Sequence, residues 1–322
     1  MKVLLSGGGT LGPVSPLLAI YEQYKKHNPK CEFVWIGTKK GPEKDVVDKY
    51  NIPFHTISSG KFRRYLSLLN LIDLFRILIG FIQSFFLILK YKPDFLITAG
   101  GFVSVPLHLA AVVLGIPTWV HQQDVRVGLA NKIMAKVANK VTTALQGSVG
   151  YFSNKKTEWI GNPVRDLSIN NISLSKKKFN LNDKPVIFAF GGGTGSNSIN
   201  NLIVSMLPHI PTDWQVIHLT GLERQGDHAE GAIDSFHNYH VYKFFTDEMK
   251  DAYAVADVVI GRGGFVTISE LASLNKPAVL LPMPNTQQEE NVKMLADNKA
   301  AIILDQRKVN GMDLGHIVKE LI

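Results

Sequence analysis

The sequence predicts an α/β protein of two domains, each built around a parallel sheet. Apolar, strand-like runs alternate with helical patterns along the chain, which is typical of parallel α/β proteins. A strand that ends on a glycine loop and continues into a helix occurs twice, at VLLSGGGTLG (3–12) and at PVIFAFGGGTG (185–195). A single dinucleotide-binding domain normally has one such opening, so the repeat predicts two similar half-molecules.

The elements of the first half follow in regular order. Between residues 3 and 144, apolar runs predict five strands, and helical patterns fill the intervals between them. We expect the strands at 3–7, 32–37, 95–100, 118–122 and 140–144, and the helices at 15–26, 42–50, 103–114 and 128–137.

The second half repeats this order after the strand at its start. We expect a helix from about Ser198 and a last helix at 312–321. The stretch IGNPVRDLSINN (160–171) is rich in Gly, Pro and Asn, so it predicts the hinge and domains of 1–163 and 164–322. We expect further strands at 215–221, 240–244, 257–261 and 277–282.

Length and composition restrict the class of protein. A chain of 322 residues, 45% hydrophobic and 19% charged, can bury two cores, and its one cysteine, Cys31, suits a reducing cytoplasm. The formal charge of +8 suits anionic lipid or phosphorylated substrates. We expect no nucleic acid partner, since no basic run alternates with aromatic residues, and we find no signal peptide and no set of residues with metal-ligand spacing.

One segment, residues 61–92, stands apart because it is bulky and apolar except for a narrow polar stripe that includes Asp73. Two interpretations remain open. It is a helix buried in the core, or a helix whose exposed part enters a bilayer surface. Charged residues interrupt it, so we do not expect a membrane span. In the second interpretation the basic residues Lys61, Arg63 and Arg64 meet lipid phosphates, and Phe75, Ile79 and Phe86 contact the membrane.

The glycine loops are candidate anion sites, because a helix N-terminus presents free N–H groups and a partial positive charge. A dinucleotide site also needs a carboxylate at the end of the second strand, and EFVWIGTKKG (32–41) has none there. Two more glycine turns follow strands, at TAGGFVSVP (98–106) and GRGGFVTISE (261–270). The carboxylate of Glu270 could accept two ribose hydroxyls, or only interact with the helix dipole.

Together, six stretches resemble the MurG family, the bacterial transferases of glycosyltransferase family 28 that add N-acetylglucosamine to lipid I. The resemblance covers nearly the whole chain and implies a GT-B fold, in which two Rossmann-like domains face each other across a cleft and the C-terminal helix returns to the first domain. The stretches are GGTLGPVSPLLAI (8–20), TAGGFVSVPLHLAAVVLGIPTWVHQQDVRVGLANK (98–132), GNPVR (161–165), GGGTGSNSIN (191–200), DVVIGRGGFVTISELASLNKPAVLLP (257–282) and QQEEN (287–291).

The resemblance implies a binding site for the donor, UDP-N-acetylglucosamine (UDP-GlcNAc). Arg165 matches the family's donor-binding arginine, and Glu270 matches the carboxylate that binds the ribose. The other matches are the diphosphate turn Gly192, Gly193 and Thr194, the uracil-cupping Thr246 and Met249, the helix opening Phe265, Val266, Thr267, Ile268 and Ser269, the sugar-binding Gln287 and Gln288, and Thr10, Leu11, Gly12 and Asp124 toward the transferred sugar.

The resemblance also implies that the first glycine loop holds the phosphates of a lipid carrier rather than a dinucleotide. The implied acceptor-diphosphate loops are Gly8, Gly9 and Thr10 together with Gly100 and Gly101.

Three departures from the family pattern affect catalysis. Pro13 replaces a histidine that has been a candidate base, and Gly193 replaces a common serine. HQQD (121–124) stands where the family has HEQN, so Asp124 is a candidate base. Alternatively, Asp124 caps a loop, or the site has lost its base. A histidine such as His121 is more often a structural residue than a base.

The resemblance implies an inverting transferase that moves N-acetylglucosamine from UDP-GlcNAc to lipid I, without metal or cofactor, at the cytoplasmic face of the cell membrane. Three alternatives remain open: a related transferase with another lipid acceptor, a retired nucleotide-sugar-binding protein, and an epimerase of the same fold. The sequence does not define the oligomeric state.

Overall fold

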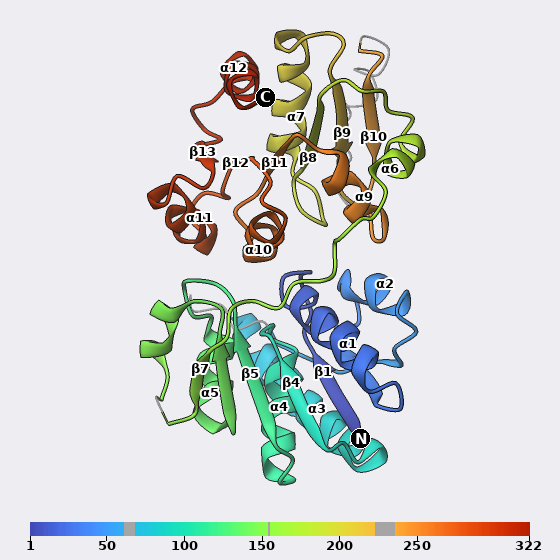
Figure 1. Cartoon of the computed structure of the whole chain (residues 1–322). Coiled ribbons are helices and arrows are strands. Elements are labelled where there is room, and N and C mark those ends of the chain that lie inside the picture. The colour runs from blue at the N-terminus through green and yellow to red at the C-terminus, as the bar shows by residue number, and fades with distance from the viewer. Residues whose placement is uncertain (61–67, 154, 223–235) are drawn as a thin grey trace. The chain divides into compact units, whose positions relative to one another are not determined.

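The computed structural model describes residues 1–60, 68–153, 155–222 and 236–322 (Figure 1). The chain divides into two compact units, residues 1–165 and 166–322, and each contains one sheet whose strands all run parallel. Of the basic residues predicted to meet lipid, Lys61, Arg63 and Arg64 lie outside the described residues.

The N-terminal unit has a seven-stranded sheet in the order β3-β2-β1-β4-β5-β6-β7. All five predicted strands are present, and two strands of three residues each, β3 and β7, are added at the edges. The elements are β1 (Lys2–Ser6), α1 (Ser15–His27), β2 (Glu32–Gly37), α2 (Glu43–Asp48), β3 (Phe54–Thr56), α3 (Leu68–Tyr91), β4 (Phe95–Thr98), α4 (Ser104–Val113), β5 (Thr118–Gln122), α5 (Leu129–Val137), β6 (Lys140–Thr143), η1 (Gln146–Tyr151) and β7 (Thr157–Trp159).

The C-terminal unit has a six-stranded sheet in the order β10-β9-β8-β11-β12-β13. Its elements are α6 (Ile172–Lys178), β8 (Val186–Phe190), α7 (Asn197–Met206), η2 (Leu207–His209), β9 (Gln215–Leu219), β10 (Tyr239–Tyr242), α9 (Glu248–Val255), β11 (Val258–Gly261), α10 (Phe265–Leu274), β12 (Ala278–Leu280), α11 (Gln287–Asp297), β13 (Ile302–Ile303) and α12 (Gly311–Leu321).

In both sheets the strand order reverses next to the first strand of the unit, between β1 and β4 and between β8 and β11. Ligands of open α/β sheets bind outside the carboxyl ends of the strands at such a reversal. The glycine loops follow these same four strands, so the fold places them at the two positions where a ligand is expected.

The last helix, α12, is part of the C-terminal unit, and its predicted return to the first domain stays a prediction. It packs against α7 and η2 of its own unit, and Leu314 and Val318 are fully buried in the core of that unit. The apolar side chains at these two positions lie one turn apart on one helix face, so burying them against α7 stabilises the C-terminal unit itself.

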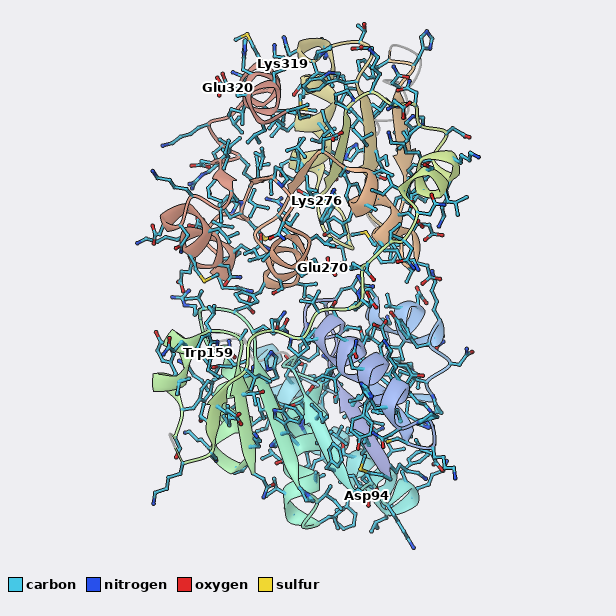
Figure 2. All side chains as sticks on the ribbon, viewed as in Figure 1. Asp94, Trp159, Glu270, Lys276, Lys319 and Glu320 are labelled. Atoms are coloured by element: carbon cyan, nitrogen blue, oxygen red, sulfur yellow. The ribbon has the colours of Figure 1, made fainter. Side chains whose placement is uncertain are left out.

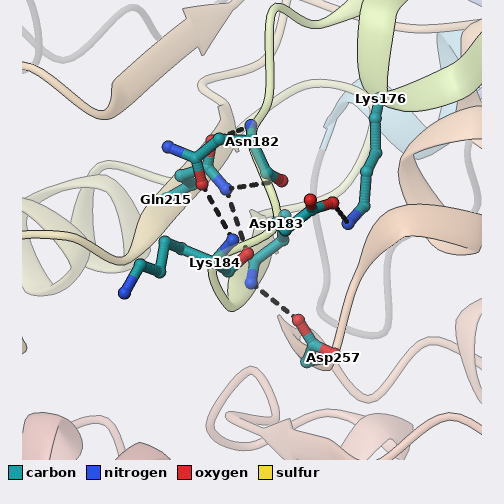
Figure 3. A network of polar contacts seen from close by, with 7 residues as sticks. Lys176, Asn182, Asp183, Lys184, Gln215 and Asp257 are labelled. Atoms are coloured by element: carbon teal, nitrogen blue, oxygen red, sulfur yellow. Dashed lines mark hydrogen bonds and ion pairs between the residues drawn. The ribbon is translucent and has the colours of Figure 1, made fainter. Parts of the chain in front are cut away.

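Polar contacts join the segments at the amino ends of the strands of the C-terminal sheet (Figure 3). The Gln215 side chain accepts a hydrogen bond from the Asn182 N–H (2.8 Å) and donates to the Lys184 carbonyl (3.0 Å). Asp257 accepts from the Val186 N–H (2.7 Å). These contacts satisfy backbone groups at the amino ends of the strands, so they stabilise the sheet away from the glycine loops.

Helix α3 buries a narrow face made mostly of small and polar residues and exposes most of its large apolar ones. Asp73, Gly80, Ser84 and Ile88 are buried, and α3 packs along α4 through this face. The backbone of α3 also lies close to the segment before it, because a Cβ on Gly80 would overlap the Ser58 carbonyl. The exposed side chains are Ile72 (47%), Leu74 (55%), Phe75 (61%), Leu78 (56%), Ile79 (49%), Ile82 (49%), Phe86 (65%) and Leu89 (49%).

This arrangement corrects the interpretation of α3 as a helix buried in the core. Although charged residues interrupt the segment, Ile72–Tyr91 is by length and composition alone sufficient to cross a bilayer. The helix nevertheless lies along its own unit: Ile88 belongs to the core formed with Leu107 and Ala111 of α4. The outward side chains of α3 therefore form an exposed apolar surface.

Candidate functional site

The two glycine loops of the N-terminal unit contact each other through their backbones. A Cβ added to Gly101 would lie 2.8 Å from the Gly8 carbonyl oxygen, and one added to Gly9 would lie 2.6 Å from the Phe102 ring. Gly9, Gly100 and Gly101 have φ of +83°, +104° and +88°, which side chains rarely adopt. The predicted acceptor loops therefore form one surface, and only glycine fits at their contact.

The first loop uses several of its donors within the protein. The Gly9 N–H donates to the Glu43 carboxylate (3.2 Å), and the Val14 and Ser15 N–H groups donate to the Leu11 carbonyl (3.1 and 3.3 Å). Thr10 and Gly12 are exposed, and Leu11 is half-buried. A ligand at this loop is therefore expected to meet Thr10, Leu11 and Gly12 rather than the N–H of Gly9.

Residues 121–124 continue this surface at the end of β5. The Gln123 amide donates to the Gly12 carbonyl (3.2 Å), and the Gln122 amide donates to the Asp124 carbonyl (2.7 Å). Asp124 itself is half-buried. Two hydrogen bonds thus hold the segment of the predicted base Asp124 at the carboxyl end of β5. Gln123 bonds the first glycine loop, and Gln122 bonds the Asp124 carbonyl.

His121 is fully buried, with Nδ1 2.9 Å from Thr142 Oγ1 and Nε2 3.0 Å from Asn162 Oδ1. Burial lowers the pKa of His121 to about 4, so the imidazole is neutral at pH 7. A neutral ring with both nitrogens bonded is structural, and it fixes the GNPVR stretch through Asn162.

Arg165, at the end of this stretch, lies beside Tyr50. Burial raises the pKa of Tyr50 to about 12, and the nearby Arg165 charge acts in the opposite direction. The Tyr50 hydroxyl donates to Glu22 (2.9 Å). Glu22 and Tyr50 were not predicted from the sequence, because Tyr50 interacts with both Glu22 and Arg165 and so joins three segments that are far apart along the chain.

The predicted donor residues of the C-terminal unit follow the carboxyl ends of β8, β10, β11 and β12, so they share one edge of the sheet. Gly192, Gly193 and Thr194 are half-buried, and a Cβ on Gly192 (φ +94°) would meet open space. The turn is closed by a hydrogen bond from the Gly195 N–H to the Gly192 carbonyl (3.0 Å). Ser196 then caps α7, whose N-terminus faces this turn.

Arg262, buried after β11, joins the two glycine turns of this unit. Its guanidinium donates to the Ser196 hydroxyl, to Gln306 Oε1 (2.6 Å) and to the Leu281 carbonyl (3.2 Å). No role was predicted for this arginine of the GRGG stretch from the sequence. A charged residue between the glycines that follow a buried strand was the signal for it.

Glu270 lies on α10 (Figure 2) and is 4% exposed. Its Oε2 accepts a hydrogen bond from the Tyr253 hydroxyl (3.0 Å), so Tyr253 orients the predicted ribose-binding carboxylate. Of the helix opening before it, Phe265 and Ile268 are buried in the unit, whereas Val266, Thr267 and Ser269 are half-buried.

The remaining predicted donor residues lie on the loop before α9 and in the first turns of α9 and α11. Thr246 is buried, and its N–H donates to Glu248 (3.2 Å). Met249 packs against the core. Gln287 is exposed at the start of α11, and the Gln288 side-chain oxygen accepts from the Met283 N–H (2.9 Å). Within the described ranges no three His, Cys, Asp or Glu side chains are grouped as a metal site.

Comparison with known proteins identifies the family. Residues 3–143 match the glycosyltransferase family 28 N-terminal domain, and residues 186–322 match the glycosyltransferase family 28 C-terminal domain. The chain belongs to glycosyltransferase family 28. This confirms the resemblance and the GT-B fold predicted from the sequence.

Two curated family 28 relatives are named UDP-N-acetylglucosamine–N-acetylmuramyl-(pentapeptide) pyrophosphoryl-undecaprenol N-acetylglucosamine transferase. The protein of Lachnospira eligens is 35% identical, over 99% of this chain and 90% of the relative. The protein of Bacillus subtilis is also 35% identical, over 98% and 88%.

Solved structures agree with the assignment to family 28. MurG of Acinetobacter baumannii is 25% identical with a TM-score of 0.71, covering 99% of this chain and 90% of that one. A UDP-GlcNAc 2-epimerase of Neisseria meningitidis, bound to UDP-GlcNAc, has the same TM-score at 16% identity, over 99% and 91%. The second likeness shows the fold alone.

Proposed function

We propose that this family 28 chain transfers N-acetylglucosamine from UDP-GlcNAc to lipid I, giving lipid II with inversion at the anomeric carbon. The observation that carries the proposal is the 35% identity, over 99% of the chain, to a transferase of this name. The grouping of the donor residues at one sheet edge and of the acceptor loops at another supports it.

In the proposed reaction an acceptor hydroxyl attacks the anomeric carbon, and the bond to the UDP oxygen breaks. The turn at Gly192–Thr194 and the N-terminus of α7 offer N–H groups and a partial positive charge to the diphosphate. Arg165 adds a full positive charge. Both stabilise the negative charge that develops on UDP as it leaves. UDP-GlcNAc is the donor substrate, and no cofactor is part of the proposal.

The proton of the attacking hydroxyl needs an acceptor. Pro13 has no titratable group, whereas Asp124 is half-buried beside the residue that bonds the first glycine loop. We therefore assign Asp124 the role of general base.

The outward face of α3 supports a membrane-bound acceptor. Phe75, Ile79 and Phe86, predicted to contact lipid, are all largely exposed on this face. We propose that α3 lies in the surface of an anionic membrane at its cytoplasmic side, where a peripheral enzyme reaches a lipid-linked substrate.

Incubation of the purified protein with labelled UDP-GlcNAc and lipid I in detergent tests the function. We expect labelled disaccharide lipid and one UDP released per transfer, both dependent on lipid I. UDP-GlcNAc binding without product would contradict the proposal. Labelling of diacylglycerol instead would identify the related transferase with another lipid acceptor.

Replacement of the base tests the mechanism. Asp124→Asn should lower kcat by about 100-fold, the usual range for losing a general base, and leave the Kd for UDP within twofold. Calorimetric titration with UDP supplies the Kd. An equal loss of turnover and UDP affinity would show that Asp124 binds the donor and is not the base.

Replacement of exposed aromatic residues tests the membrane face. We expect the double variant Phe75→Ser, Phe86→Ser to bind vesicles containing phosphatidylglycerol at least tenfold more weakly. Each substitution removes an aromatic ring and so reduces the apolar area that the helix buries in the membrane. The matched control is Ile172→Ser, at a residue that is 51% exposed on α6 of the other unit. Unchanged co-sedimentation of the double variant would contradict the assignment of α3.

A further inference from the structure

A carboxylate lies buried beneath the first glycine loop. Glu43 is fully buried at the start of α2, and three donors surround its two oxygens. The Gly9 N–H donates to Oε2 (3.2 Å). The Thr38 N–H donates to Oε1 (2.6 Å), and the Thr38 hydroxyl donates to the same oxygen. One side chain thus ties the loop after β1 to the end of β2.

Glycines make room for this carboxylate. A Cβ on Gly8 would overlap Oε1, and a Cβ on Gly41 would overlap Oε2. Gly8 also supports the second loop, since a Cβ on Gly101 would lie 2.8 Å from its carbonyl oxygen. Glu43, the first loop and the second loop therefore form one packed stack in which no layer can move alone.

The chemistry of the donors requires an acceptor with no hydrogens of its own. An ionised carboxylate accepts on both oxygens, whereas an amide must present its NH₂ to either Gly9 or Thr38. A buried donor that faces another donor loses its hydrogen bond and is destabilised. Glutamine has nearly the same size as Glu43, but it cannot accept all three of these hydrogen bonds.

The same geometry explains why the G-x-G-x-x-G pattern does not form a dinucleotide site. In such sites a carboxylate after the second strand binds the ribose hydroxyls. Here Glu43 follows β2 and reaches the glycine loop, but it is fully buried and its oxygens accept from the protein. The position predicted to lack a carboxylate thus has one nearby, directed inward.

We propose that Glu43 is a positioning residue for the lipid acceptor: its carboxylate fixes the first glycine loop against the second and so shapes the surface that receives the acceptor diphosphate. The inference rests on the proposed function. Glu43 acts through Gly9 and Gly8 and touches no substrate.

The test compares Glu43→Gln with Asp45→Asn. Asp45 lies in the same first turn of α2 but is exposed, so its variant makes the same charge change without altering the loop. For Glu43→Gln we expect kcat/KM for lipid I to fall about tenfold or more, while the Kd for UDP stays within twofold. For Asp45→Asn we expect both constants to stay at the wild-type value.

Thr38→Val removes a single donor and serves if Glu43→Gln folds poorly. It should lower kcat/KM for lipid I less, about two- to fivefold, with the UDP Kd unchanged. An unchanged kcat/KM in a folded Glu43→Gln protein would overturn the proposal. A loss of transfer and UDP binding in the same proportion would also overturn it, because that is the result of lost folded protein alone.

Hydrogen exchange of the peptide covering residues 7–14 separates this proposal from the proposed function. Glu43→Gln should speed exchange of this peptide, and Asp45→Asn should not, whether or not the wild type transfers sugar. Unchanged exchange contradicts the role of Glu43. If Glu43→Gln speeds exchange but the wild-type protein transfers no sugar, only the assigned reaction is contradicted.

Discussion

The contact between two glycine loops at the strand reversal of the N-terminal sheet is the constraint on which the proposed acceptor surface depends. Gly8 and Gly101 meet as backbone against backbone, and neither position has room for a side chain. Glu43 fixes this stack from below, and Gln123 bonds it to the end of β5, next to Asp124. Three loops from three strands are thereby held at fixed positions by bonds that involve main-chain atoms.

In the C-terminal unit, a different kind of side chain connects the two glycine turns at the strand reversal. Its glycine turns, after β8 and β11, are joined by the buried guanidinium of Arg262, which reaches Ser196 at the cap of α7. The two units differ in the charge of the buried side chain at their glycine loops: a guanidinium in the C-terminal unit and a carboxylate in the N-terminal unit. Tyr253 similarly restrains Glu270 through a hydrogen bond. Glu270 is predicted to contact the donor, whereas Tyr253 was assigned no role from the sequence.

Local patterns made the sheets predictable, and long-range contacts left the rest hidden. Buried strands such as β1 and β8 show as apolar runs ended by glycines, whereas β3 and β7 have only three residues each and no such signal. The periodicity of α3 was visible, but not which face is buried, because Gly80 and Ser84 pack inward and Phe86 points out. Glu43 and Tyr50 are ordinary in sequence. Arg262 has a local signal in its place between glycines, but only folding brings its partners Ser196 and Gln306 to it.

The central claim is that backbone contact between the glycine loops shapes the acceptor surface, and the kcat/KM of Gly101→Ala for lipid I tests it most directly. Alanine at φ +88° is strained and would place its Cβ 2.8 Å from the Gly8 carbonyl oxygen. The account predicts a loss of about tenfold or more in a folded protein whose UDP affinity is unchanged. A wild-type kcat/KM in that protein would contradict it.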